Sequence, residues 1–166
     1  MRYNSIGEYF YKLSNRCLVL ALLPVVLIWI AFVINQKYFS GSLIYEINGQ
    51  HLYIIVLSTG IMMASQFWFQ RHKSMIKLNY LQKEPSLGMR MKGYSSIVIY
   101  RFYNFSLMLL FVGVGIFIST ELTFLFLIPI PIISFLLYWP SRWRMSRDLH
   151  LKVEEQQILR DDKLGV

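Results

Sequence analysis

Charged residues are scarce in this sequence, and its long apolar runs contain almost none. Only 16% of the 166 residues are charged, whereas 55% are hydrophobic and the mean hydropathy is +0.44. An ordinary soluble domain carries about 25% charged residues and interrupts its apolar stretches more often. The composition therefore predicts an integral membrane protein.

Cysteine occurs once, at Cys17, which excludes an internal disulfide and a thiolate metal site. The residue lies at the start of the first apolar run, where we interpret it as a small apolar side chain. Reversible palmitoylation is the alternative, because the residue lies beside the predicted membrane. The same run lacks a small-x-small cleavage site after it, which favours an uncleaved anchor over a secretory signal.

Residues that usually carry out membrane chemistry are also missing. No acidic residue lies inside any apolar run, which excludes the usual carboxylate proton relay or cation site. His51, His72 and His150 all lie outside the runs, so no histidine pair can hold a haem at mid-membrane. Phosphate-binding glycine loops, HExxH and GxSxG motifs are absent. The sequence therefore predicts no enzyme, no cofactor and no metal site.

Four apolar runs have the length of transmembrane helices. A hydrocarbon core about 30 Å thick needs about 20 helical residues. Residues 119–121 alone separate the last two runs, so these must form an antiparallel hairpin. We predict an all-α integral membrane four-helix bundle of two antiparallel transmembrane hairpins, with a membrane domain over residues 1–140. The predicted spans are residues 17–34, 52–70, about 97–118 and 122–139.

Shorter segments flank the first span. Ser5 and Glu8 match a capping box, and apolar residues follow at helical spacing. This stretch is either a separate amphipathic helix at the membrane interface or the first turns of the first span. Asn48 and Gly49 form a turn signal, which allows a small hairpin in the first loop.

The C-terminal tail, residues 141–166, carries six basic and five acidic residues. We expect it to be cytoplasmic and helical to about Leu159. Glu154 and Glu155 are interpreted as a solvated helix face rather than as catalytic carboxylates. Residues 71–92 are expected to form a basic connection between the second and third spans, with a possible short helix that is broken at Pro85, Ser86 and Gly88.

The distribution of lysine and arginine sets the orientation. Sixteen of the 17 basic residues fall on one side of the predicted topology, and Lys37 alone falls on the other. By the positive-inside rule both termini and the central connection are cytoplasmic, in a plasma membrane or a bacterial inner membrane. Topology thus accounts for the basic charge, so no nucleic-acid partner is predicted. Binding of anionic lipid headgroups at the basic face fits the same distribution.

The two predicted hairpins share short sequence patterns. Residues 11–15 and 100–104 both read Tyr, base, two residues, Asn. Residues 68–73 and 139–144 both read Trp-x-x-Arg-x-base. An internal duplication about an axis along the membrane normal explains these matches. Aromatic and basic residues also gather at any cytoplasmic interface, so both explanations stay open.

Small residues and prolines mark candidate packing and hinge positions. Gly60 and Ala64 form a small-xxx-small pair in the second span, which would let another helix approach closely. Pro129 and Pro131 fall within the fourth span, where they would kink the helix and free backbone carbonyls. Pro24 should bend the first span for the same reason.

Asn104, Gln66 and Arg101 form the candidate intramembrane polar cluster. Counting inward at about 1.5 Å per residue puts the two amides at one depth, roughly 21 Å below the outer surface. An unpaired amide is costly there, so we expect Asn104 and Gln66 to pair. Arg101 lies one turn nearer the cytoplasm. It can anchor in the headgroups by snorkelling, pair with a carboxylate, or line a water-filled cavity for an ion, a substrate or a lipid headgroup.

These features leave two main functional hypotheses. The first is a non-catalytic multi-pass subunit or scaffold of a larger inner-membrane assembly, with other membrane proteins or further copies of the chain as partners. The second is a small homo-oligomeric channel or transporter with a cytoplasmic-side polar vestibule lined by Arg101, Asn104 and Gln66. A lipid-modifying enzyme is a third, for which no nucleophile and base can be named. We favour the first because catalytic residues are absent and the charged tail is long.

Overall fold

Most of the part of the chain that the structure describes is helical. The computed structural model describes residues 5–38, 49–119 and 126–160, which form six helices and no strand. The all-α prediction is therefore confirmed for these residues. The helices are α1 (Ile6–Tyr38), α2 (Gly49–Leu81), α3 (Leu87–Ser119), α4 (Pro129–Leu137), α5 (Arg142–Leu149) and α6 (Val153–Arg160).

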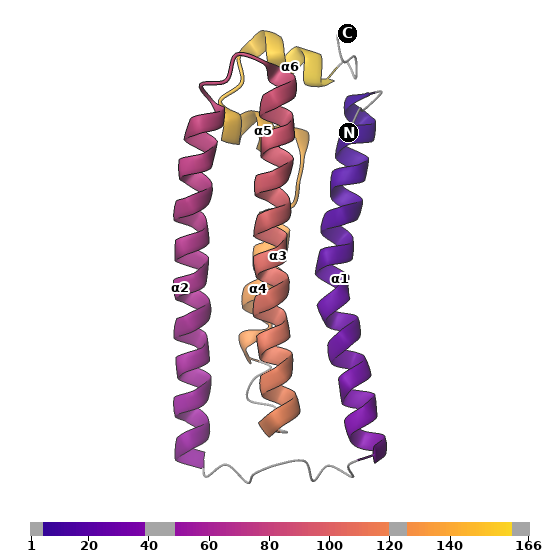
Figure 1. Cartoon of the computed structure of the whole chain (residues 1–166), viewed down its shortest axis with the longest axis vertical. Coiled ribbons are helices and arrows are strands. Elements are labelled where there is room, and N and C mark those ends of the chain that lie inside the picture. The colour runs from indigo at the N-terminus through magenta and orange to yellow at the C-terminus, as the bar shows by residue number, and fades with distance from the viewer. Residues whose placement is uncertain (1–4, 39–48, 120–125, 161–166) are drawn as a thin grey trace.

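Helix α3 is the centre of the arrangement. Figure 1 shows α1 on one side of α3 and α2 on the other, with α4 along α3 and with α5 and α6 at the upper end. Helix α1 runs parallel to α3, and the two form the most extensive helix pair. The hydroxyl of Tyr9 donates to the carbonyl of Met91 at 2.6 Å, and the hydroxyl of Ser106 donates to the carbonyl of Leu20 farther along. The main packing thus joins helices of different predicted hairpins.

The buried core is concentrated towards the end at which α1 begins. Cys17 belongs to this core and is fully buried. That position contradicts palmitoylation and agrees with the small apolar interpretation. Apolar side chains of the tail, including Met145 and Leu149, join the same core. The members from α1 and α3 include Ile6, Tyr9, Phe10, Leu13, Tyr94, Val98, Phe102 and Phe105.

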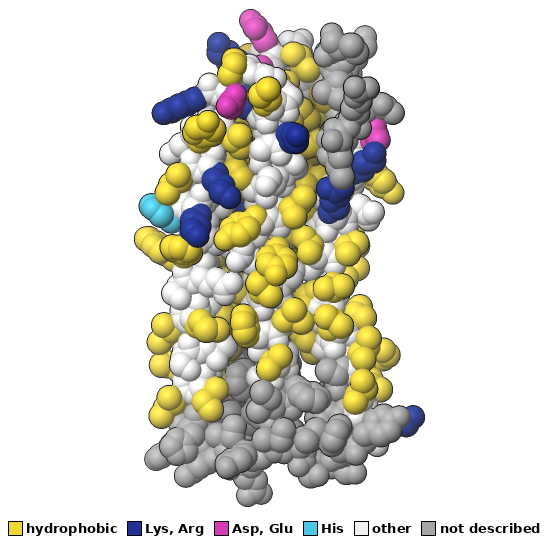
Figure 2. Space-filling model, viewed as in Figure 1, with side chains coloured by type: hydrophobic (Ala, Val, Ile, Leu, Met, Phe, Trp, Pro, Cys, Tyr) yellow, Lys and Arg dark blue, Asp and Glu magenta, His cyan; other side chains and the backbone are white. Residues whose placement is uncertain are grey.

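Two of the helices are long and apolar enough to cross a membrane. They are Ile6–Ile30 within α1 and Leu87–Ile116 within α3, and they alone meet this criterion among the described residues. Core helices of soluble proteins and signal sequences can have the same properties, so the four-span bundle stays a prediction. The start of α1, the turn between α2 and α3, and helices α5 and α6 lie at one end (Figure 1). On the face drawn in Figure 2, lysine and arginine side chains gather mostly towards that end.

The long helices extend beyond the predicted spans. Ser5 Oγ accepts a hydrogen bond from the backbone N–H of Glu8 at 3.1 Å, so the predicted cap is present. Helix α1 then continues without a break, which makes the capped residues its first turns and rules out a separate interfacial helix. Helix α2 runs on to Leu81, and α3 begins at Leu87. The expected basic connection is therefore mostly helix, with a turn at residues 82–86.

The prolines of the last predicted span begin a helix instead of kinking one. Helix α4 starts at Pro129, so Pro129 and Pro131 both lie in its first turn. A missing backbone N–H costs no helical hydrogen bond there. Helix α1, by contrast, continues through Pro24. The predicted kink by Pro129 and Pro131 is therefore wrong.

The β-hairpin predicted in the first loop is wrong in its second strand. Helix α2 begins at Gly49, so the residues that were expected to form the second strand are helical. The first strand of the predicted hairpin, residues 42–47, lies outside the described residues. Most of the short link at residues 119–121 lies outside them as well.

Small residues make close contacts at other positions than predicted. Ala64 is exposed, and a Cβ added to Gly60 would lie 3.6 Å from Leu127, an ordinary contact. The predicted packing stripe is therefore wrong within this chain. A Cβ added to Gly113 would overlap the side chain of Ile28, so the close approach is between α1 and α3. The buried face of α2 consists instead of Met63, Gln70, Ser74 and Leu78.

The residues of the proposed repeat occupy different local structures. Tyr11 lies in the second turn of α1, whereas Tyr100 lies in the fourth turn of α3. Residues 68–73 lie inside α2, whereas residues 139–144 contain the break between α4 and α5. These differences favour the interface explanation of the shared patterns.

Candidate functional site: a polar cluster where α2, α3 and α5 meet

The two predicted amides lie together between α2 and α3. Gln66 Nε2 lies 3.4 Å from Asn104 Oδ1, to which it donates. Asn104 Nδ2 donates to the carbonyl of Tyr100 at 2.7 Å, one turn back on its own helix. Both amide atoms of Asn104 are therefore engaged. This pairing suits helix packing better than ligand binding.

Arg101 is buried one turn away and does not snorkel. Arg101 is only 5% exposed, so its predicted anchoring among lipid headgroups is wrong. Arg101 Nη1 lies 3.6 Å from Asp148 Oδ2 of α5, and its guanidinium lies 4.9 Å from the ring centre of Tyr138. The carboxylate that pairs with this arginine thus comes from the tail.

Further arginines crowd the same carboxylate. Arg147 Nη2 lies 3.5 Å from Asp148 Oδ1, and the guanidinium of Arg144 lies 4.9 Å from the ring centre of Tyr138. The guanidinium groups of Arg101 and Arg147 therefore share one carboxylate, and a third, that of Arg144, lies on the ring of Tyr138 beside Arg101. The cluster carries an excess of positive charge, which favours an additional anion.

Several buried polar atoms on the facing helices α2 and α3 have no hydrogen-bond partner in the described part of the chain. They are both amide atoms of Gln70, the hydroxyl of Ser74 and the hydroxyl of Tyr94. Gln70 and Ser74 lie one turn apart on α2, and Tyr94 lies on α3. A buried polar group without a partner costs about 1–3 kcal/mol. These atoms are therefore candidates for contact with a ligand or a bound water.

The cleft beside these residues is narrow. Phe67, Gln70 and Arg71 line it from α2, and Arg101, Phe105 and Tyr138 line it from the other side. Its empty space is about 160 Å³, counting space open to solvent, and it has no room for a water molecule. The water-filled vestibule predicted for Arg101, Asn104 and Gln66 is therefore not present within one chain. Within the described residues, no group of three or more His, Cys, Asp and Glu side chains could hold a metal.

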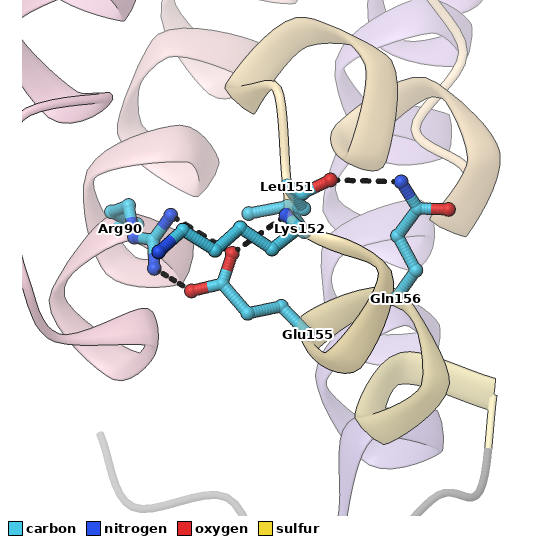
Figure 3. Close-up of polar contacts among 5 residues, drawn as sticks. All are labelled: Arg90, Leu151, Lys152, Glu155 and Gln156. Atoms are coloured by element: carbon cyan, nitrogen blue, oxygen red, sulfur yellow. Dashed lines mark hydrogen bonds and ion pairs between the residues drawn. The ribbon is translucent and has the colours of Figure 1, made fainter.

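A second ion pair holds α6 against α3. Arg90 donates from Nη1 and Nη2 to the two carboxylate oxygens of Glu155, and the backbone N–H of Lys152 donates to the same carboxylate at 3.0 Å (Figure 3). Burial by itself raises the pKa of Glu155. The hydrogen bonds from Arg90 and Lys152 lower this pKa by more, so it lies below its ordinary value. Glu154 is exposed. The solvated-face interpretation thus holds for Glu154 and is wrong for Glu155.

The turn between α2 and α3 also binds the tail. Gln82 Nε2 donates to the carbonyl of Asp148 at 3.0 Å and lies 2.7 Å from Nδ1 of His150. His150 ends α5 in the left-handed conformation, with φ of 49°. Together with the two ion pairs, these contacts fold the described part of the tail back over the end of the bundle.

Sequence reasoning missed Asp148, Gln70 and Tyr94. A signal for Gln70 exists, because Gln66, Gln70 and Ser74 recur every four residues and so share one face of α2. Asp148 gives no such signal, since it lies in a tail that was expected to be separate from the spans. No family model matches the chain, and no curated protein or solved structure is detectably similar to it.

Proposed function

We propose that this chain is a non-catalytic multi-pass subunit or scaffold of a larger membrane assembly, in an inner or plasma membrane. The observation that carries the proposal is the exposed apolar surface of α1. Of its most apolar stretch only 17% is buried within the chain, against 56% for α3. Such a surface needs a cover of lipid or of other transmembrane helices.

The exposed surface of α1 is long and contains a large aromatic anchor. Trp29 is 66% exposed, and apolar side chains flank it along several turns. Buried aromatic residues contribute much of the binding energy at protein interfaces. The exposed apolar residues near it include Leu22, Leu23, Val25, Val26, Ile30 and Val33.

Site-specific photocrosslinking in native membranes tests the proposal. A photoreactive residue at Leu22 or Trp29 should give discrete crosslinks to another membrane protein or to a second copy of the chain. The same residue at Val112, which is fully buried against the core, is the matched control and should give none. Crosslinks to lipid alone from every exposed position, together with a monomer in gently solubilised membranes, would contradict a subunit or scaffold role.

A homo-oligomeric channel or transporter is the second candidate. The unpartnered polar atoms of Gln70, which lines the cleft with Arg101, and of Ser74 one turn along α2 favour it, because a conduction path needs polar groups inside the protein. The narrow cleft requires that such a path form between protomers. Flux into liposomes, compared between the natural chain and an Arg101→Ala variant, tests this function. Absence of flux under every applied gradient would exclude it.

A further inference from the structure

We propose that Gln70, Arg71 and Arg101 form a binding site for a phosphate group, and that its ligand is the headgroup of an anionic phospholipid. The proposal rests on the membrane location proposed above but not on the role as a subunit. The basic end of the molecule suggests contact with anionic lipid only in general, whereas these three residues define a specific site.

The charge at the site calls for an anion. Arg101 shares Asp148 with Arg147, and Arg144 lies beside the same aromatic ring. The distance of 3.6 Å between Arg101 and Asp148 exceeds that of a hydrogen bond, so the guanidinium keeps donors for another acceptor. A phosphate accepts from guanidinium groups in a bidentate manner, which makes arginine well suited to bind it.

The amide of Gln70 calls for a ligand with both an acceptor and a donor. The residue is 3% exposed, lines the cleft with Arg101, and has neither amide atom bonded within the described chain. Its Nε2 can donate to a phosphate oxygen. Its Oε1 needs a donor, which a phosphodiester lacks but a hydroxyl of the headgroup supplies. These demands together favour a glycerol-type headgroup over a bare phosphate.

The surroundings of the site resemble a membrane interface. Phe67 and Phe105 provide an apolar wall to the cleft. Farther along α2, the ammonium group of Lys73 lies 4.4 Å from the ring centre of Phe69. Aromatic and basic side chains gather at headgroup level in membrane proteins. Because the cleft as it stands has no room for a water molecule, binding a phosphate requires the exposed side chain of Arg71 to move aside.

Thermal unfolding and native mass spectrometry of the detergent-purified full chain test the site. The probes are phosphatidylglycerol, phosphatidylcholine and inorganic phosphate, each added to the natural chain and to Arg71→Gln, Gln70→Leu and Lys73→Gln variants. Phosphatidylglycerol should raise the melting temperature and remain bound, and phosphatidylcholine should do neither. Loss of one charge-assisted contact should weaken phosphatidylglycerol binding about tenfold in Arg71→Gln and Gln70→Leu. Lys73→Gln is the matched control, because it removes a neighbouring exposed cation outside the cleft.

The outcomes separate the site from its alternatives. A similar loss in Lys73→Gln and Arg71→Gln would overturn the site in favour of diffuse attraction to the basic surface. Equal effects of both phospholipids would overturn it as well. An equal effect of inorganic phosphate with the same variant pattern would support the phosphate site and identify a soluble ligand. If alkaline carbonate extracted the chain from membranes, the proposed membrane location would be wrong. This control distinguishes failure of the membrane location from failure of the site alone.

Discussion

The two sides of α3 are built from different interactions. Towards α1 the contact is close and mostly apolar, with Gly113 directly against Ile28 and with hydroxyls of Tyr9 and Ser106 bonded to backbone carbonyls across it. Towards α2 and α5 the contact contains an amide pair and a buried ion pair between Arg101 and Asp148. Apolar packing tolerates small shifts, whereas buried polar groups are stable only in the arrangement that pairs them. The α1 side of α3 therefore supplies most of the packing, whereas the polar side determines where α2 and the tail lie.

Removing Asp148 should have the largest effect. An Asp148→Asn substitution leaves Arg101 and Arg147 without their carboxylate, and breaking a buried pair in this way costs about 3–5 kcal/mol. Chemical unfolding of the detergent-solubilised protein measures the loss. Glu154→Gln, at an exposed acidic residue of the same tail, should change the free energy of unfolding by less than about 0.5 kcal/mol. Equal effects of the two substitutions would show that the buried pair has no special role.

Filling the close contact on the other side of α3 should come next. A Gly113→Leu substitution forces a side chain into the space of Ile28, and such overpacking costs about 1–3 kcal/mol. The control is Gly88→Leu, where the nearest atom to an added Cβ is Ser86 Oγ at 3.9 Å. Thermal unfolding compares the two variants. An unchanged melting temperature in Gly113→Leu would contradict the tight packing of α1 on α3.

Acidification should release α6 from α3. The pKa of Glu155 is lowered in the folded chain, so its contribution to stability is complete above the unfolded pKa of about 4.3. That contribution is lost as the pH falls through the lower, folded pKa. Hydrogen exchange of the α6 amides, corrected for intrinsic rates, should therefore accelerate below about pH 4. A Glu155→Gln variant should exchange faster already at pH 7, and Glu154→Gln should not.

Separating the amide pair should have the smallest effect. A Gln66→Leu substitution removes one donor to Asn104, whose Nδ2 keeps its bond to Tyr100. Hydrogen bonds between transmembrane helices average about 0.6 kcal/mol, and the contact of 3.4 Å is long. Unfolding in mixed micelles should therefore change by about 0.5 kcal/mol. A loss as large as that in Asp148→Asn would mean that the amide pair, rather than the ion pair, organises the polar side.

The sequence predicted those features that depend on neighbouring residues. The cap at Ser5, the all-helical character and the shared depth of Gln66 and Asn104 follow from local spacing, because a helix has a regular rise. A break near Pro85 is predicted by the sequence, whereas the unbroken continuation of α2 from the predicted span to Leu81 is not, because basic residues indicate a connection. A helix can carry such residues beyond an apolar stretch, since its backbone hydrogen bonds do not depend on side-chain polarity.

The sequence alone predicts long apolar helices, and it predicts that most of the basic residues gather on one side of the topology. Only the tertiary structure decided that Asp148 meets Arg101, that Glu155 meets Arg90, and that Gly113 is a packing glycine where Gly60 is not. Helical periodicity acts over a few residues and can be read along the chain. The choice of a partner 47 residues away for Arg101 or 65 for Arg90 depends on how whole helices pack, and local spacing contains no record of it.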